Sequence, residues 1–171
     1  LSCLPPIVPG GAPLSVGLTP ALLDRLELVT VVDGLGASET GAQAAQVSAI
    51  GAVSAGRSFR PTPWTCILSD DRRRLLGPDE AREGWLAQRG RVPLGYLDDP
   101  QATAERFPVI DGERVALSGD RARWTTEGTV ELLGREATTI CSGGEKVFAE
   151  EVEAALREHD AVQDVAVVGA P

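Results

Sequence analysis

The segment from Gly34 to Gly41 sets a hydroxyl and a carboxylate side by side within a glycine-rich loop. Glycines let backbone N–H groups approach phosphate oxygens closely, and the Ser38 hydroxyl can donate one more hydrogen bond. The Glu39 carboxylate can hold a Mg²⁺ ion that neutralises the phosphates. Glycines of this kind more often form a plain turn, so the segment alone leaves both interpretations open.

Two further motifs follow along the chain. Ser118-Gly119-Asp120 predicts an aspartate on a tight turn at a strand start, where its carboxylate can accept two hydrogen bonds from a vicinal diol such as ribose. In Gly134-Arg135, the planar guanidinium can bind phosphate as a fork. An ordinary surface turn and a solvent-exposed arginine are the alternatives for each motif taken singly.

The composition limits the kinds of molecule that the chain can bind by charge. The chain has 171 residues with 16 Lys+Arg against 25 Asp+Glu, a net charge of −9, which excludes attraction to nucleic acid or an anionic membrane by charge alone. It has neither an apolar run of the roughly 18–20 residues that span a bilayer nor a signal-peptide pattern at its start. We therefore expect a soluble, cytoplasmic protein without a transmembrane segment.

Single residues carry further expectations. Cys3, Cys66 and Cys141 are odd in number and widely spaced, which favours small buried residues in a reducing compartment over disulfides or a metal cluster. His159 is the only histidine, so a Cys–His pair requires distant residues. The chain begins with Leu1 and contains no methionine, and we therefore expect it to be a fragment.

The first elements must position the glycine-rich segment. The sequence predicts a strand over residues 3–8 and a turn over 10–13. It then predicts a helix that is capped by Thr19, has Pro20 in its first turn and ends near Leu28, followed by a strand over 29–32. This order is typical of an α/β layer whose ligands bind at the strand ends.

The remaining elements are shorter. A small antiparallel barrel or sheet is predicted, with a helical turn over residues 100–107 between its strands, which cover residues 46–53, 64–68, 84–88, 114–117, 121–124 and 129–133. A helix from Glu150 with Val152, Leu156 and His159 on one face should precede a strand over 164–169. So small a helix–strand unit cannot bury its own faces, so we expect it to be part of a larger domain.

Taken in order, these motifs resemble those of the adenylate-forming superfamily, which contains acyl-CoA synthetases, luciferases and peptide-synthetase adenylation domains. Residues 34–39 resemble its aromatic-Gly-x-Thr-Glu motif, 118–120 its Thr-Gly-Asp, and 134–135 its Gly-Arg. Residues 142–145 with 151–153 are similar to the start of its mobile C-terminal domain. The sequence of residues 84–87, 95–96 and 103–107 is similar to the corresponding sequences of actinobacterial fatty-acyl-CoA ligases, including those acting on sterol side chains.

The resemblance implies an α/β fold in two parts. Residues 1–134 would be the end of the AMP-binding large domain, with its last α/β part over 1–45 and a small β-barrel over about 46–133. Residues 135–171 would be the hinge and the truncated beginning of a small α+β domain. Ala137 stands where relatives usually have a polar hinge residue, which leaves the hinge position less well defined.

The resemblance also implies roles for individual residues. Ser38 would contact the α-phosphate, Glu39 would hold Mg²⁺, and Arg135 would assist at the ribose or phosphate. The nucleotide would further contact Gly11, Ala12, Pro13, Gly34, Leu35, Gly36 and, through the ribose hydroxyls, Asp120. Leu35 replaces the usual aromatic ring, so its contact with adenine would be dispersion only. Gly143 and Gly144 would line the pantetheine tunnel.

The implied reaction has two steps. ATP and a carboxylic acid, fatty or similar to a sterol side chain, would form an acyl-adenylate, and the thiol of CoA would then displace AMP. A phosphate-loop lysine before Leu1 and a C-terminal lysine beyond Pro171 are implied, so we expect the fragment alone to be inactive. An adenylating enzyme that loads a carrier protein, and a non-catalytic nucleotide-binding remnant, are the alternatives. Oligomeric state and acyl chain length have no sequence signal.

Overall fold

The structure is a computed structural model, and it describes residues 6–10, 17–26, 28–54, 57–142, 145–159 and 161–170. Its main feature is an eight-stranded sheet in the order β1-β2-β3-β10-β9-β6-β4-β5, in which neighbouring strands run antiparallel. The strands of this sheet are β1 Val31–Ala37, β2 Gly41–Ser48, β3 Ser58–Pro61, β4 Thr65–Leu68, β5 Leu75–Leu76, β6 Gly84–Gln88, β9 Ala116–Trp124 and β10 Val130–Arg135. The fold is mixed α/β with a mostly antiparallel sheet.

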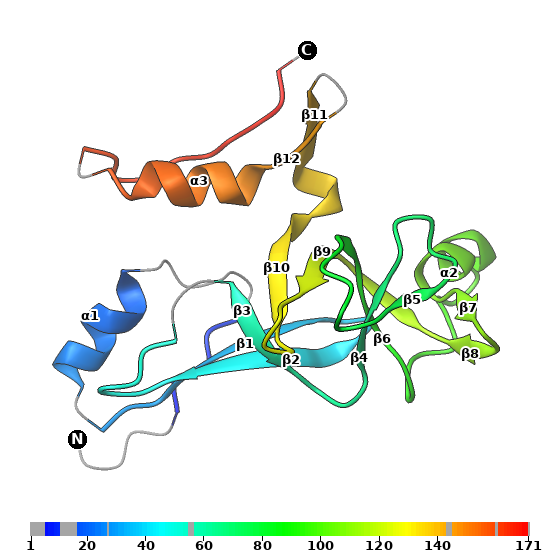
Figure 1. Ribbon diagram of the computed structural model, residues 1–171, viewed down its shortest axis with the longest axis horizontal. Coiled ribbons are helices and arrows are strands. Elements are labelled where there is room, and N and C mark those ends of the chain that lie inside the picture. The colour runs from blue at the N-terminus through cyan, green and yellow to red at the C-terminus, as the bar shows by residue number, and fades with distance from the viewer. Residues whose placement is uncertain are drawn as a thin grey trace.

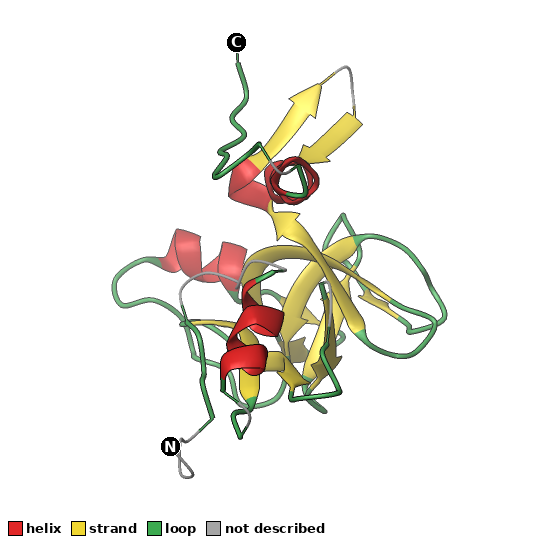
Figure 2. Cartoon of the chain, turned by 90° about the vertical axis from the view of Figure 1, so that its left-hand side faces the viewer, coloured by secondary structure: helices red, strands yellow, loops and turns green. Residues whose placement is uncertain are grey.

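Smaller elements surround the sheet. They are the helices α1 Leu18–Arg25, α2 Pro100–Arg106 and α3 Ala149–Arg157, the 3₁₀ turn η1 Glu136–Thr138, and the two-stranded pairs β7 Val109–Ile110 with β8 Glu113–Arg114 and β11 Thr139–Ser142 with β12 Glu145–Phe148. Helices α1 and α2 lie at opposite ends of the molecule (Figure 1). The β11–β12 hairpin and α3 extend beyond the end of β10 (Figure 2). No helix among the described residues is long and apolar enough to cross a membrane.

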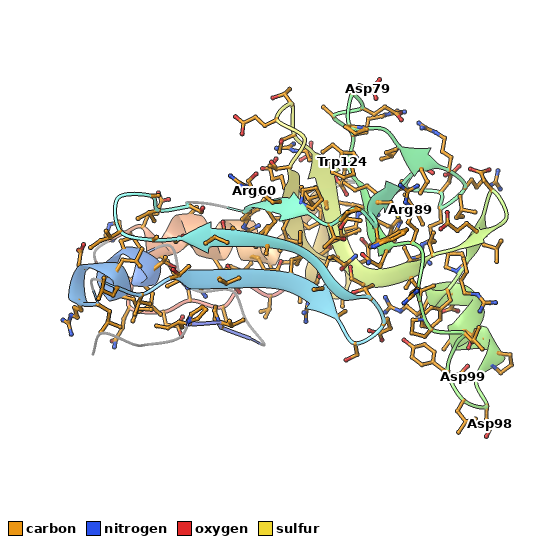
Figure 3. All side chains as sticks on the ribbon, turned by 90° about the horizontal axis from the view of Figure 1, so that it is seen from below. Arg60, Asp79, Arg89, Asp98, Asp99 and Trp124 are labelled. Atoms are coloured by element: carbon orange, nitrogen blue, oxygen red, sulfur yellow. The ribbon has the colours of Figure 1, made fainter. Side chains whose placement is uncertain are left out.

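Two apolar clusters form the core on opposite faces of the central strands. Successive strand side chains point to opposite faces, so Ile67 and Leu86 join one cluster while Leu68 and Ala87 join the other. Strands β4 and β6 are buried along their whole length. Trp124 lies in the first cluster (Figure 3), and its indole N–H donates to the Leu76 carbonyl oxygen at 3.0 Å.

Two elements match the sequence predictions closely. The strand predicted over residues 84–88 is β6, and the predicted helical turn is α2 with Pro100 in its first turn. The Asp99 carboxylate caps this helix by accepting a hydrogen bond from the Ala102 N–H at 2.8 Å. Both features depend on residues adjacent in sequence, which is why local patterns predict them.

The surroundings of two motifs differ from the predictions. Gly34 to Gly36 belong to β1 itself, so the predicted glycine loop is a hairpin with only a short turn. Residues 118–120 lie inside the continuous strand β9, not on a turn between two strands. Leu117 pairs with Ala87 of β6, and Arg121 pairs with Trp85. Between these two pairs β9 has the three residues 118–120 where β6 has one, and a ladder irregularity with Gly119 at φ +91° accommodates the extra residues.

Other predictions about the elements were wrong. Helix α1 begins at Leu18 with Gly17 as its N-cap, so Thr19 is not the cap. Residues 164–169 form no strand, because backbone groups there bond to α3 side chains, as the Val167 N–H does to Glu153 at 2.9 Å. His159 lies beyond α3 and is exposed.

The cysteine prediction was correct for one residue and wrong for another. Cys66 is buried, and burial raises the pKa of its thiol to about 11, which makes it inert. Cys141 is exposed. Cys3, the first half of the strand predicted over 3–8 and most of the turn over 10–13 lie outside the described residues.

A buried guanidinium lies at the end of the sheet nearest the C-terminal elements. The Arg121 side chain on β9 is 1% exposed. Its Nη2 donates to Asp70 at 2.7 Å and to Glu83 at 2.8 Å, and its Nε donates to the same Glu83 oxygen at 3.1 Å. The guanidinium also lies 4.6 Å from the ring centroid of Trp85. This residue therefore has both hydrogen-bonding and cation–π partners.

The same network reaches the chain beyond β10. The Glu136 carboxylate of η1 is 3.7 Å from Arg121 Nε. Lys146 of β12 lies 3.4 Å from Asp70 and 3.9 Å from Glu136. These charges, which we call the Arg121 network (Asp70, Glu83, Arg121, Glu136 and Lys146), connect the sheet to the C-terminal elements.

Glu83→Gln tests how much the Arg121 network stabilises the fold. The substitution removes a charged acceptor from a buried guanidinium, and the free energy of unfolding should fall by about 2 kcal/mol. Glu131→Gln is the matched control, since it removes the partner of the surface residue Arg123 and should cost less than about 1 kcal/mol. Denaturant unfolding measures both, and equal losses would contradict a special role for the buried cation.

Candidate functional site

The tip of the β1–β2 hairpin carries the predicted hydroxyl and carboxylate. A Cβ at Gly36 would clash with the carbonyl oxygen of Gly41, so only glycine allows the two strands to approach so closely here. The Thr40 hydroxyl accepts a hydrogen bond from the Ala37 N–H at 3.0 Å and closes the turn. Ser38, which is exposed, and Glu39, which is half-buried, are thereby presented at the end of the sheet.

Glu39 is held by a residue 57 positions away in the sequence. The Tyr96 hydroxyl donates to Glu39 Oε1 at 2.6 Å. This hydrogen bond holds the pKa of the Glu39 carboxyl below its ordinary value, while partial burial opposes the shift and the charge of Arg106 adds to it. Glu39 is therefore an oriented, ionised carboxylate at neutral pH.

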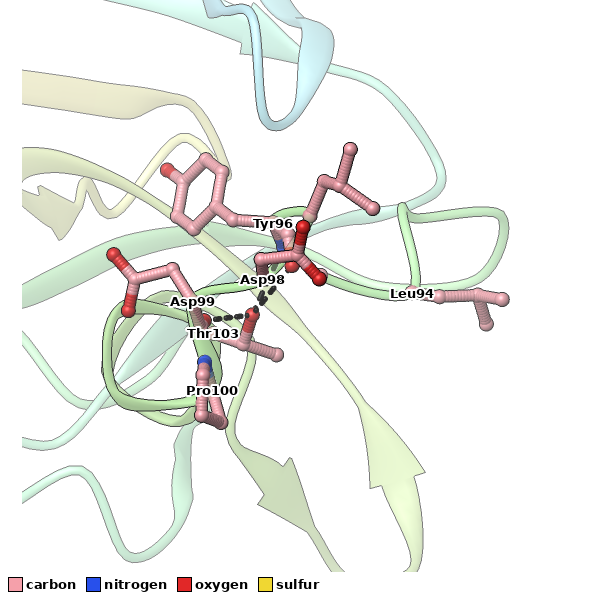
Figure 4. Close-up of a pocket in the computed structure, with 8 residues that line it drawn as sticks. Leu94, Tyr96, Asp98, Asp99, Pro100 and Thr103 are labelled. Carbon is pink, nitrogen blue, oxygen red and sulfur yellow. Dashed lines mark hydrogen bonds between the residues drawn. The ribbon is translucent and has the colours of Figure 1, made fainter.

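The segment before α2 fixes Tyr96 in turn. Its backbone N–H donates to the Thr103 hydroxyl oxygen at 2.9 Å (Figure 4). Its ring packs edge-on against Phe107, with 5.4 Å between the centroids. The same segment lines an open hollow of about 580 Å³ in which Leu94 and Leu97 are largely exposed. Tyr96 is thus anchored at both its backbone and its ring.

The second half of the site pairs two predicted residues across neighbouring strands. Asp120 on β9 lies opposite Arg135 on β10, and Arg135 Nε donates to Asp120 Oδ1 at 3.3 Å. Asp120 is 4% exposed, whereas the Arg135 side chain is 66% exposed. The pair presents a shielded carboxylate beside an accessible guanidinium, a combination suited to a diol next to a phosphate.

The remaining predicted residues fall into three groups. Leu35 is buried in the first core cluster, and its contact with adenine stays a prediction. Gly134 lies where β10 meets the C-terminal elements, because a Cβ there would come within 3.0 Å of Phe148 and 2.7 Å of Glu150. The predicted site residues that lie outside the described part of the chain are Gly11, Ala12, Pro13, Gly143 and Gly144.

Sequence reasoning missed Tyr96 and Arg121 as partners of the predicted site. Tyr96 is the only tyrosine of the chain, which was an available signal. Arg121 directly follows the Ser-Gly-Asp motif, but nothing in its neighbours along the chain indicates that it is buried. Both roles depend on contacts between segments far apart in sequence.

The metal prediction has a simple structural test. No group of three or more potential ligand side chains that could hold a metal ion occurs among the described residues. Mg²⁺ in nucleotide sites is commonly held by one or two carboxylates together with substrate phosphates and water. A single ionised carboxylate such as Glu39 fits that kind of site, and the described residues do not form a closed metal cage.

The fold and the order of the motifs define the class of protein: a segment of an adenylate-forming enzyme. Across all 171 residues the chain is 49% identical to the medium-chain acyl-CoA ligase Mig of Mycobacterium avium, of which it spans 31%. It is 43% identical over 88% of its length to a Mycobacterium tuberculosis medium/long-chain-fatty-acid and 3-oxocholest-4-en-26-oate CoA ligase, of which it spans 27%.

Solved structures agree with this class. The amide bond synthetase McbA from Marinactinospora thermotolerans superposes with a TM-score of 0.75 at 27% identity, covering 96% of this chain and 33% of that one. No family model matches the chain. The chain belongs to the adenylate-forming superfamily and spans about a third of the length of the relatives it matches.

Tyr96→Phe tests the hydrogen bond that orients Glu39. Without the hydroxyl donor, the pKa of Glu39 should rise toward its ordinary value, because this bond is the largest cause of the lowering. Carboxyl ¹³C NMR titration measures the change, with Glu39→Gln assigning the signal. Ser69→Ala is the control, because it removes a hydroxyl that donates a hydrogen bond to a different carboxylate, that of Asp71. It should leave the pKa of Glu39 unchanged. An unaltered Glu39 pKa in Tyr96→Phe would disprove the contact.

Proposed function

We propose that this chain is the part of an acyl-CoA ligase that binds the nucleotide and joins the two domains. The intact enzyme activates a carboxylic acid with ATP to an acyl-adenylate and transfers the acyl group to CoA. The 49% identity to an acyl-CoA ligase across the whole chain carries this proposal. The names of both mycobacterial relatives favour a medium- or long-chain fatty acid or a sterol side-chain acid.

We propose the domain boundary between residues 134 and 135, one residue before β10 ends. Residues 1–134 belong to the large domain, with an α/β part over 1–45 and a small barrel over about 46–133, and 135–171 begin the mobile domain. The close approach at Gly134 and the short turn η1 support this assignment, because a swinging domain needs a compact joint. Lys146 contacts Asp70 within the Arg121 network, and such a swing has to break this contact.

The site residues then have distinct roles. Asp120 accepts hydrogen bonds from the ribose hydroxyls, and Arg135 binds at the ribose or phosphate side. Ser38 donates to the α-phosphate, and Glu39 is the carboxylate that would hold Mg²⁺, which supplies charge neutralisation to the phosphates when bound. Attack of a carboxylate on phosphorus requires positioning and charge neutralisation, which these groups provide.

The other assignments complete the proposal. Gly11, Ala12 and Pro13 with Gly34 to Gly36 follow the nucleotide, and Gly143 and Gly144 line the path of the CoA pantetheine. Buried, inert Cys66 is compatible with a cytoplasmic location. Transfer to an acceptor other than CoA is the rival function, which the likeness to an amide bond synthetase favours.

The acceptor distinguishes the two functions. A longer protein that contains this chain, incubated with ATP, Mg²⁺ and a medium-chain fatty acid, should release AMP rapidly only when CoA is added. Rapid release with an amine or a carrier protein, and not with CoA, would favour the rival. Absence of pyrophosphate exchange with every acid of a broad panel would reject adenylation itself.

The 171-residue chain alone should form no acyl-adenylate. Its only lysine, Lys146, lies beside Asp70 and Glu136, so no lysine is free to act on ATP phosphates in this arrangement. Exchange of labelled pyrophosphate into ATP, measured with the chain and with the longer protein at equal concentration, tests this. Exchange by the chain at a rate comparable with that of the longer protein would contradict the prediction.

A further inference from the structure

Arg106 lies between the two halves of the candidate site, and neither the motifs nor the comparisons assign it a role. It is exposed at the last turn of α2. A Cβ placed on Gly119 would meet Arg106 Nη1 at 2.8 Å, so the guanidinium rests against the backbone of the residue preceding Asp120. Its charge also contributes to the lowered pKa of Glu39 and opposes the raised pKa of Tyr96. Arg106 is thus the described residue that both halves share.

Among the residues that the structure describes, the guanidinium nevertheless has no partner of its own. In the described part of the chain it makes no hydrogen bond and has no carboxylate within 4.0 Å. Glu39 is nevertheless near enough for the charge of Arg106 to contribute to the lowering of the Glu39 pKa. The Glu39 carboxylate is bonded to Tyr96 and the Asp120 carboxylate to Arg135. Both carboxylates therefore already have donors, and the five N–H groups of Arg106 stay free for a ligand.

A structural role does not account for this position. A cation in the last turn of a helix is favoured by the helix dipole, but that effect is small and does not require contact with another strand. Arg25 occupies the same place in α1 and is likewise exposed. What distinguishes Arg106 is its contact with Gly119, which has no side chain and a φ of +91°.

We propose that Arg106 binds a phosphate group of a ligand bound at this site, as a specificity-determining residue. The inference rests on the proposed function, because Asp120 and Glu39 define where the nucleotide lies. A guanidinium beside a diol-binding aspartate and a candidate magnesium carboxylate matches a phosphate in charge and in planar, two-pronged geometry. Two sources supply such a phosphate: the terminal phosphates of ATP and the phosphates of CoA.

Calorimetric binding to a longer protein that contains this chain separates these sources without measuring turnover. The ligands are AMP, ATP with Mg²⁺, and CoA, and the variants are Arg106→Gln and Arg106→Lys. Arg25→Gln is the matched control, since it removes an exposed arginine from the last turn of a short helix at the opposite end of the molecule (Figure 1). A thermal melt of each variant reports whether the fold is retained.

The expected result is a loss of affinity confined to one phosphate source. Arg106→Gln should weaken ATP at least tenfold and AMP less than twofold, Arg106→Lys should recover part of the loss, and Arg25→Gln should match the wild type. A tenfold loss for CoA alone would support phosphate binding and assign the phosphate to CoA. Unchanged affinity for all three ligands, or equal loss for all three with a lower melting temperature, would overturn the inference. A wild-type protein that binds none of them would reject the proposed function itself.

Discussion

The burial of the Arg121 guanidinium is the constraint on which the joint between the sheet and the C-terminal elements depends. A cation removed from water is tolerated only with charged acceptors around it, and here Asp70, Glu83 and Glu136 provide them. These acceptors come from the β4–β5 connection, the segment before β6 and η1. One buried charge therefore fixes three segments relative to β9, and β9 carries Asp120 as the preceding residue.

Close backbone approach is the second device that builds the site. At Gly36 it brings β1 onto β2 so that the hairpin presents Glu39, and at Gly134 it brings β10 against Phe148 and Glu150. At Gly119 it leaves room for the Arg106 guanidinium. In each case another segment of the chain occupies the space that a Cβ would need. This is a stricter requirement on the residue type than a turn alone imposes.

The site is therefore assembled from segments far apart in sequence. The hairpin tip supplies a carboxylate, the segment before α2 supplies the tyrosine that orients it, and β9 and β10 supply the Asp120–Arg135 pair. Among the charged groups of this site, Glu39, Asp120 and Arg135 each have a partner, and Arg106 has none within the described part of the chain. This arrangement fits the proposed function, in which the ligand brings both a diol and negative charge.

The sequence by itself determined the motifs, the family resemblance and the elements that depend on neighbouring residues. Helix α2 follows from Asp99 and Pro100, and β6 from a short apolar run, because capping and strand propensity act locally. Only the tertiary structure decided that residues 118–120 continue β9, since Leu117 and Arg121 on either side of them pair with β6 and Asp120 pairs with Arg135 of β10. It also decided that Arg121 is buried, that Tyr96 bonds to Glu39, and that residues 164–169 bond to α3 and form no strand. Those outcomes depend on contacts between distant segments, and a pattern of neighbouring residues does not carry that information.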